Sequence, residues 1–198
     1  MKLLGLTGGV GMGKSTAAGF FEQFGVPIVD TDQLARELVQ PGQLALAEIR
    51  AAFGDQIIGP DGQLRRDELA NFVFKDSGAR KKLEEILHPR IRERWLARAE
   101  AWRSENRPLA IVVIPLLYET GAAPHFDKVI CVACSEDSRH ERLSGRGWTQ
   151  SQIDARIAAQ MPVTEKISRA GFVIWSEGNL ENHSRQVRSI LERISTTP

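Results

Sequence analysis

The sequence predicts an α/β fold: a five-stranded parallel sheet with helices on both faces, a helical insertion and a small helical lid. Three observations lead to this prediction. Short apolar segments with the length of buried strands alternate with helical stretches, and they cover residues 3–7, 26–30, 109–114, 128–134 and 171–175. A glycine-rich loop directly follows the first of these strands. A long stretch without a convincing strand separates the second strand from the third, and it is longer than a single crossover needs.

The first strand leads into Gly8-Gly9-Val10-Gly11-Met12-Gly13-Lys14-Ser15, which matches the pattern G-x-x-x-x-G-K-[ST]. A helix is expected over residues 16–24, with Gly25 as its C-terminal stop. Between a strand and a helix N-terminus, backbone N–H groups and the helix dipole favour an anion, and Lys14 adds a cation. The hydroxyl of Ser15 is suited to Mg²⁺. The segment therefore predicts a P-loop that binds a nucleoside triphosphate, in a sheet of the P-loop NTPase type.

The stretch between the second and third strands reads as an inserted helical subdomain. Apolar spacing and stop signals predict helices over residues 32–40, 44–53, 67–75 and 79–106. His88-Pro89 interrupts the last of these, and a proline there is expected to kink the helix or split it in two.

The C-terminal part of the chain predicts a second insertion and a closing helix. A helix over residues 138–144 ends in Gly145-Arg146-Gly147, and Thr149 with Gln152 forms a capping box that opens another helix towards Met161. An amphipathic helix over residues 180–194 is expected to pack on the sheet. The predicted parts are a nucleotide-binding core (1–31, 107–137, 168–198), a helical subdomain (32–106) and a lid (138–167).

Composition argues against several classes of protein. The 26 Lys and Arg residues nearly balance 25 Asp and Glu residues, which argues against a protein that coats nucleic acid. No apolar run has the length of a membrane span, and the chain enters a strand at once, so no signal peptide is expected. We expect a cytoplasmic monomer. Cys131 and Cys134 lie three apart on a predicted strand and point to opposite faces, so we expect neither a disulfide nor a metal site.

Asp30 and Asp32 follow the second predicted strand. Residues two apart on a strand face the same way, so both carboxylates are expected to point from the sheet edge towards the P-loop. One carboxylate can accept a hydroxyl proton during phosphoryl transfer, and the other can hold Mg²⁺ through water. The alternative is that Asp32 only caps the following helix.

Arginines cluster where the predicted lid begins. Arg142 and Arg146 lie four apart and are expected to share a helical face, so that both can reach one phosphate ligand. Arg156 and Gln160 form a second pair of this kind in the same predicted lid. The alternative is a solvated charged helix without a ligand.

Five segments in order, over nearly the whole chain, resemble the dephospho-coenzyme A kinase family. They are GLTGGVGMGKST (residues 5–16), VDTDQLAR (29–36), LHPRI (87–91), PLLYE (115–119) and RIAAQMP (156–162). The resemblance implies a P-loop kinase core, a coenzyme A-binding helical subdomain and a lid. It also implies ATP-dependent phosphorylation of the ribose 3′-hydroxyl of dephospho-coenzyme A, which gives coenzyme A and ADP.

The resemblance also implies roles for single residues. Asp32 resembles the general base of the family, and Lys14 with the lid residues Arg142 and Arg146 would supply positive charge to the phosphates. The ATP phosphates would be held by Gly11, Met12, Gly13, Lys14, Ser15 and Thr16. The acceptor would be bound by Thr7, Asp32, His88, Leu116, Leu117 and Glu119. Mg²⁺ would contact Ser15 and, through water, Asp30.

The chain departs from the family pattern at four positions. Met12 stands where the family usually has serine, and Val113 stands where many members have aspartate. Gly171 and Ser176 replace the usual aspartate and asparagine near the last strand. The valine leaves Mg²⁺ to Ser15, water and an aspartate after the second strand.

Two other functions remain open at this point. A kinase on the same scaffold can act on a nucleoside monophosphate, and the arginines that would face such an acceptor are Arg36, Arg65, Arg66 and Arg90. The second alternative is a nucleotide-binding regulatory protein without catalysis, of which Val113 and Gly171 would be signs.

Overall fold

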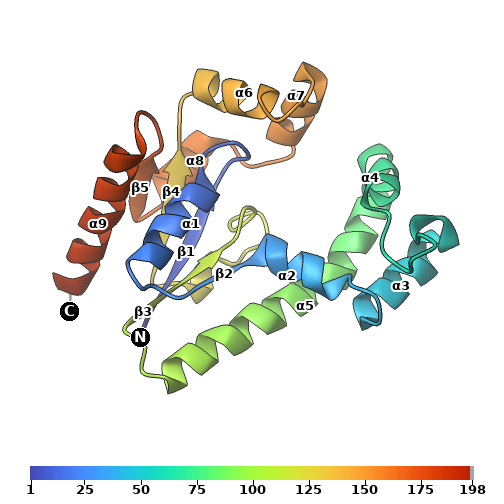
Figure 1. Cartoon of the computed structure of the whole chain (residues 1–198), viewed down its shortest axis with the longest axis horizontal. Helices are drawn as coiled ribbons and strands as arrows, with labels where there is room; N and C mark the ends of the chain where they lie inside the picture. Colours follow the sequence, from blue (N-terminus) through green and yellow to red (C-terminus); the bar gives the residue numbers. More distant parts are fainter. Residues whose placement is uncertain (197–198) are drawn as a thin grey trace. The chain divides into compact units, whose positions relative to one another are not determined.

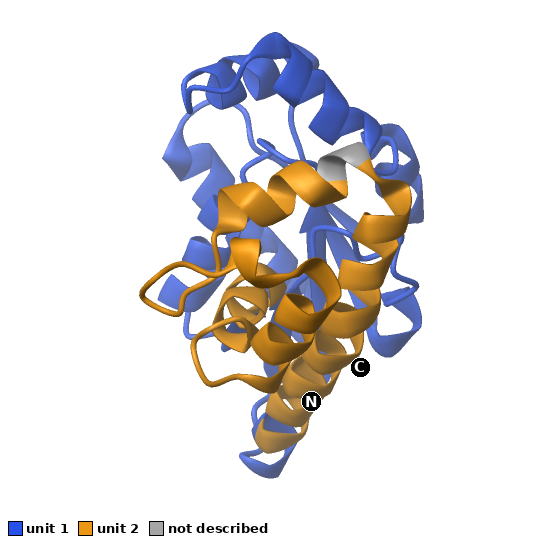
Figure 2. Cartoon of the chain, turned by 90° about the vertical axis from the view of Figure 1, so that its right-hand side faces the viewer, with its two compact units in different colours: residues 1–29, 102–198 blue, residues 30–101 orange. Residues whose placement is uncertain are grey.

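The computed structural model describes residues 1–196, without the side chains of residues 74 and 75. The chain forms two compact units, Met1–Val29 with Trp102–Pro198 and Asp30–Ala101 (Figure 2). The sequence placed the corresponding boundaries at 31/32 and 106/107. Residues 138–167 belong to the first unit, and their role as a lid stays a prediction.

The sheet has five strands, and its class is the one predicted. The strands are β1 (Lys2–Gly8), β2 (Ile28–Asp30), β3 (Leu109–Val113), β4 (Lys128–Ala133) and β5 (Phe172–Trp175). Their order is β2-β3-β1-β4-β5, and β1 pairs in parallel with both β3 and β4 (Figure 1). Leu6 of β1 is in register with Val113 of β3 and Ile130 of β4. The loop after β1 therefore leaves from the middle of the carboxyl edge, where ligands bind in such sheets.

One core lies between the sheet and the helices α1 (Lys14–Gln23) and α9 (Leu180–Thr196). Leu4 and Leu6 alternate along β1 towards this core, and α1 contributes the fully buried Phe21. The predicted packing of the last helix is confirmed by its buried residues, which are Val187, Ile190 and Ile194. Gly5 points to the other face, where Leu117 and Phe126 occupy the space of a side chain.

Three helices follow β4 within the first unit: α6 (Glu136–Ser144), α7 (Gln150–Ala158) and α8 (Val163–Arg169). The predicted capping box is present, because Thr149 accepts from the Gln152 backbone and the Gln152 side chain accepts from Thr149. The structure adds α8, which the sequence did not predict because a seven-residue helix has too few turns to show a period. A short 3₁₀ helix, η2 (Ala123–His125), precedes β4.

The second unit contains α2 (Thr31–Leu38), α3 (Leu44–Phe53), the 3₁₀ helix η1 (Asp55–Ile57), α4 (Arg66–Lys75) and most of α5 (Ser77–Ser104). It has a core of its own, centred on Leu46, Ile49, Ile57 and Leu69. The predicted helical character of this insertion agrees with these elements.

The expected split at Pro89 does not occur, because α5 continues through the proline as one helix. Proline removes one backbone hydrogen bond at a cost of about 3 kcal/mol. The apolar residues of α5 on both sides of it are packed: Leu83, Ile86 and Leu87 join the core of the second unit, and Trp95 is 2% exposed. Burial of these side chains offsets the lost bond. No helix among the described residues is long and apolar enough to cross a membrane.

Candidate functional site

The P-loop joins the end of β1 to the start of α1. Gly8 is required because a Cβ there would overlap the carbonyl oxygen of Val132 on the neighbouring strand. Gly13 takes a left-handed conformation, with φ of 86°, directly before the first turn of α1. A glycine has no side chain that caps the helix, so backbone N–H groups at the start of α1 are offered to a ligand.

The predicted phosphate-binding residues lie in this loop and helix start. The Lys14 ammonium donates to the carbonyl oxygens of Gly8 and Gly9, both at 2.9 Å, and so lies over the loop. Ser15 and Thr16 are exposed at the first turn of α1. Met12 is fully buried, and its sulfur packs against Gly9 of the loop.

Side chains from beyond the loop hold Val10 at both of its backbone polar groups. The Val10 N–H donates to Gln160 Oε1 at 2.9 Å, and Arg139 Nε donates to the Val10 carbonyl at 3.0 Å. Arg139 is only 4% exposed and pairs with Glu136 at 3.3 Å. The sequence did not predict either contact, although Arg139 lies in the arginine-rich segment and Gln160 in the predicted lid.

Arg142 is fixed between the P-loop and the segment after β5. It donates to Ser176 Oγ at 2.9 Å, to the Ser176 carbonyl at 2.5 Å and to the Gly11 carbonyl at 3.5 Å. The Ser176 hydroxyl in turn donates to the Met12 carbonyl at 2.8 Å. Ser176, which replaces the asparagine usual in the family, therefore links the arginine to the phosphate loop.

The predicted pairing of Arg142 with Arg146 on one helical face is wrong. Helix α6 ends at Ser144, and Arg146 lies exposed in the following turn. Gly145 ends the helix, and the backbone bond from Arg146 N to the Leu143 carbonyl closes a tighter turn than an α-helix makes. The two arginines therefore do not share the four-residue helical spacing that the pattern suggested.

The segment after β3 carries the predicted acceptor-site residues of the first unit. The Pro115 carbonyl accepts from the Thr7 hydroxyl at 3.1 Å, and Thr7 is fully buried. Leu116 is half-buried, and Leu117 is fully buried against Gly5. The Glu119 side chain is 21% exposed.

Two other departures from the family pattern also have clear positions. Val113 is 2% exposed and belongs to the core that β3 shares with α1 and α9. An apolar contact thus stands at the position where the resemblance implied a carboxylate. At Gly171, a Cβ would meet the flexible Lys128 side chain at 3.1 Å, so glycine leaves room for this lysine.

Asp30 and Asp32 lie in the second unit, and their predicted arrangement on one strand is wrong. Strand β2 ends at Asp30, and α2 begins at Thr31. Asp30 caps this helix, because its Oδ1 accepts from the Asp32 N–H at 2.8 Å. Asp32 is exposed in the first helical turn, where the helix dipole favours its negative charge. The capping role considered for Asp32 therefore falls to Asp30.

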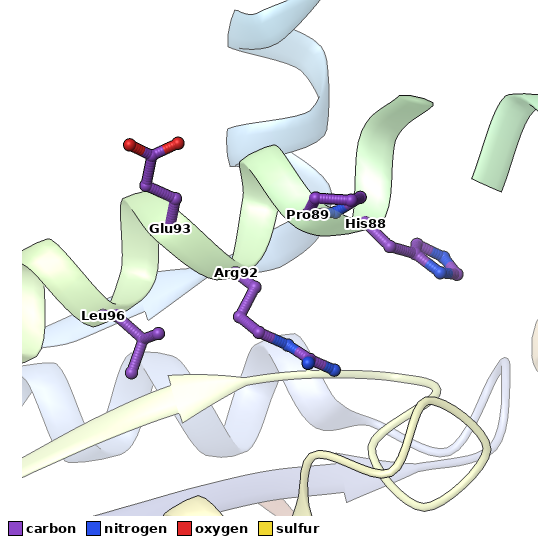
Figure 3. A pocket seen from close by; sticks show the side chains of 5 residues that line it. All are labelled: His88, Pro89, Arg92, Glu93 and Leu96. Carbon is purple, nitrogen blue, oxygen red and sulfur yellow. The ribbon is translucent and has the colours of Figure 1, made fainter. Parts of the chain in front are cut away.

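His88 lines a pocket of about 470 Å³ on α5 together with Pro89, Arg92, Glu93 and Leu96 (Figure 3). In this view Arg92 and Leu96 point to the same side of the helix, and Glu93 points to the other. The sequence analysis missed Arg92, although it follows His88 by four residues and is therefore its neighbour on a helix. Arg90, which it named for a monophosphate acceptor, is engaged by Glu48 at 2.5 Å.

Both cysteines are free and buried, and Cys134 lies just after the end of β4 rather than on the strand. Burial raises the pKa of Cys131 to about 11, and burial also raises the pKa of Cys134. His183 on α9 is buried beside Phe20, and its burial lowers its pKa. The burial of these three groups favours their neutral forms near pH 7.

The described residues fit the group that a P-loop holds. The donor set combines backbone N–H groups at the start of α1, the Lys14 ammonium and an exposed serine hydroxyl. Such a set suits a polyphosphate, with the Ser15 oxygen as a hard ligand for its Mg²⁺.

The family is decided by a match that runs through nearly all of the chain. A family model described as dephospho-CoA kinase matches residues 2–182. This chain belongs to the dephospho-CoA kinase family. A dephospho-CoA kinase of Anaeromyxobacter dehalogenans is 45% identical over 179 residues, which are 90% of this chain and 85% of that protein. The dephospho-CoA kinase of Geobacillus kaustophilus is 40% identical over 191 residues, which are 96% and 95%.

Solved structures agree with this family. TT1252 from Thermus thermophilus has a TM-score of 0.83 at 34% identity and covers 100% of this chain and 98% of its own. A dephospho-CoA kinase from Campylobacter jejuni has a TM-score of 0.73 at 26% identity and covers 98% of each chain. A shikimate kinase from Bacteroides thetaiotaomicron, at 14% identity and a TM-score of 0.52, shares the fold alone.

Gly13→Ala is expected to weaken ATP binding by about ten-fold or more, because the new Cβ forces the loop to shift and misplaces charge-assisted hydrogen bonds. Gly25→Ala is the matched control: Gly25 has φ of 80°, close to the 86° of Gly13, but nothing lies within 4 Å of its Cβ position. Both variants should lose about 1–2 kcal/mol of unfolding free energy from the left-handed backbone alone. Titration calorimetry with ATP separates them, and equal affinities would contradict the loop geometry.

Glu177→Gln is expected to make the thermal stability of the protein depend less on pH below 4.5. Hydrogen bonds from Ser135 and then Trp175 lower the pKa of Glu177 from 4.5 to about 2. Because the folded-state pKa is depressed, the stabilisation is present above the unfolded pKa and is lost as pH falls from 4.5 towards 2. The variant should therefore have a lower Tm at pH 7 and a flatter decline in Tm across this window. Glu192→Gln, exposed on α9, is the control, and a variant curve parallel to the wild-type curve would refute the assignment.

Proposed function

We propose that the protein is an ATP-dependent kinase that phosphorylates the ribose 3′-hydroxyl of dephospho-CoA and releases CoA and ADP. The observation that carries this proposal is the intact P-loop, with Lys14 over its carbonyls, in a chain that matches the dephospho-CoA kinase family over residues 2–182. A regulatory protein that binds ATP would also have this loop, so turnover on an acceptor is what separates the two functions. The monomeric state and the cytoplasmic location stay predictions of the sequence.

The proposed mechanism is mainly one of alignment and charge neutralisation. Phosphoryl transfer passes through a loose transition state, so the protein has to aim the acceptor hydroxyl at the γ-phosphorus and stabilise negative charge. Lys14 and the N–H groups from Gly11 to Thr16 bind the phosphate oxygens, and Arg142 adds positive charge beside them. Asp32 accepts the proton of the ribose 3′-hydroxyl as this oxygen attacks.

Mg²⁺ is part of this proposal. When bound, the ion would supply positive charge against the phosphate oxygens of ATP. Ser15 would hold it directly, and Asp30 is a candidate to hold it through water. Because Val113 supplies no carboxylate, this protein would rely on fewer charged ligands than relatives with an aspartate there.

Candidate residues for the acceptor are named in each unit by their chemistry. Thr7 lies near the end of β1, whereas Leu116, Leu117 and Glu119 follow β3, and His88 lines the pocket on α5. Arg92 in the same pocket adds a cation suited to the pyrophosphate of dephospho-CoA. Of the arginines expected for a nucleoside monophosphate, Arg90 is paired with Glu48 and Arg65 with Glu68, which favours the larger acceptor.

The first test is ADP release by the purified protein with ATP and Mg²⁺, comparing dephospho-CoA with AMP, CMP and adenosine. We expect turnover with dephospho-CoA alone and its loss in Lys14→Ala or after chelation of Mg²⁺. Turnover with a monophosphate would keep the kinase and replace the substrate. ATP binding without turnover on any acceptor would instead support the regulatory alternative.

Asp32→Asn is expected to lower kcat about 10²- to 10⁴-fold, the usual effect of removing a general base. The amide keeps the size and exposure of the side chain, so ATP affinity should stay within a factor of about two. Steady-state kinetics with saturating ATP measures the effect. A variant that turns over like the wild type would remove Asp32 from this role.

Asp30→Asn is the matched control for that variant. Asparagine is as good an N-cap as aspartate, so α2 should keep its first turn while the charge is lost. If Asp30 helps to hold Mg²⁺, this variant needs a higher Mg²⁺ concentration for half-maximal rate but keeps its kcat at saturation. An unchanged Mg²⁺ dependence would limit Asp30 to capping.

A further inference from the structure

Lys166 of α8 is a charged side chain in the interior of the first unit. Its side chain is 0% exposed, and its ammonium lies 2.8 Å from Glu119 Oε1 and donates to the Pro115 carbonyl at 2.8 Å. Both partners belong to the segment after β3 that is proposed to bind the acceptor. Because Lys166 is fully covered, it acts on a ligand only through these neighbours.

The Pro115 carbonyl and the Glu119 carboxylate each accept one further hydrogen bond. The Pro115 carbonyl also accepts from the Thr7 hydroxyl at 3.1 Å, and Thr7 directly precedes the P-loop. Glu119 Oε1 also accepts from the Met161 N–H at 2.9 Å, just before α8. The lysine therefore joins the end of β1, the segment after β3 and the segment that leads back from residues 138–160.

Stability alone gives little reason to place a lysine here. Removing an ammonium from water is costly, and well-packed apolar side chains of the same volume are often as stable as a buried ion pair or more stable. What a charged pair adds is a fixed geometry, since it has a narrow range of favourable distances and directions. Cys131 does not balance the lysine, because burial keeps its thiol protonated; Glu119 is the anion that does.

We propose that Lys166 is a positioning residue for the acceptor: it holds Glu119 and the Pro115 carbonyl in place beside Thr7, so that Glu119 presents its other carboxylate oxygen to dephospho-CoA. Both described contacts of the Glu119 carboxylate use Oε1. The side chain is 21% exposed, so it is not sealed from a ligand. This inference rests on the proposed kinase function and assigns a role to a residue that does not touch substrate.

The test is a comparison of KM values for the two substrates in Lys166→Met. The methionine keeps the length of the side chain and removes its charge and hydrogen bonds. We expect KM for dephospho-CoA to rise about ten-fold or more, as for a misplaced binding group, while KM for ATP stays within about two-fold. Lys166→Arg, which keeps the charge and the donors, should recover most of the loss.

Glu119→Gln gives a second route to the same answer if the lysine variant folds poorly. It should also raise KM for dephospho-CoA selectively, and the double variant with Lys166→Met should be no worse than the more affected single variant, because both remove one coupled interaction. Val187→Ala is the control for a loss of stability alone, because Val187 is a fully buried residue of α9 in the core of the first unit. It should lower Tm without changing either KM.

The outcomes separate this inference from the proposed function. An active wild type whose Lys166→Met variant has a lower Tm but unchanged KM values would show that the lysine is only structural and would overturn the inference alone. Equal rises in both KM values, or additive effects in the double variant, would also overturn it. A wild type without any turnover on dephospho-CoA would overturn both.

Discussion

The P-loop works under one constraint: a loop that offers its own N–H groups to a ligand cannot use all of them to hold its own shape. Other parts of the chain must then hold it through its remaining polar groups. Arg139 and Gln160 bind both sides of Val10, and the Ser176 hydroxyl binds the Met12 carbonyl. Lys14 itself spans the carbonyls of Gly8 and Gly9. The loop is thus shaped before a nucleotide arrives, which reduces the ordering that binding requires.

These contacts give α6 and the segment before α8 a role in shaping the P-loop. They carry the side chains that hold the loop, and they carry them from positions more than a hundred residues away in the sequence. The buried cations among them are each matched by a partner, Glu136 for Arg139 and Glu119 for Lys166. A nearly neutral chain therefore places positive charge around one loop without leaving a buried charge unpaired.

The sequence was sufficient where the signal is local. The strands, the P-loop and the capping box at Thr149 each depend on neighbours within a few residues, and the structure has them near the expected bounds. It was insufficient where a small shift in the start of a helix changes the role of a residue. Helix α2 starts at Thr31, so its cap is Asp30 and not Asp32. Pro89 does not split α5, because that outcome depends on how well the rest of the helix is packed.

Some residues of the site could likewise be predicted from local sequence, and others could not. Lys14 and Ser15 could be named from a pattern, because the pattern describes one continuous turn of backbone. The contacts of Arg142 with Ser176 and of Lys166 with Glu119 could not, because no spacing in the sequence relates segments that meet only in the fold. Arg146 was assigned by extending a helical period past Gly145, where the helix had already ended.

The burial of the two cysteines has a consequence for redox chemistry. The proposed substrate and product both carry a thiol, and their oxidised forms are disulfides that exchange with accessible protein thiolates. Cys131 is 0% exposed and its burial raises its pKa to about 11, and Cys134 is also buried. Because both thiols are covered, we expect no mixed disulfide between this chain and coenzyme A. An enzyme at this place in metabolism would keep its activity while the oxidation state of its own product pool changes around it.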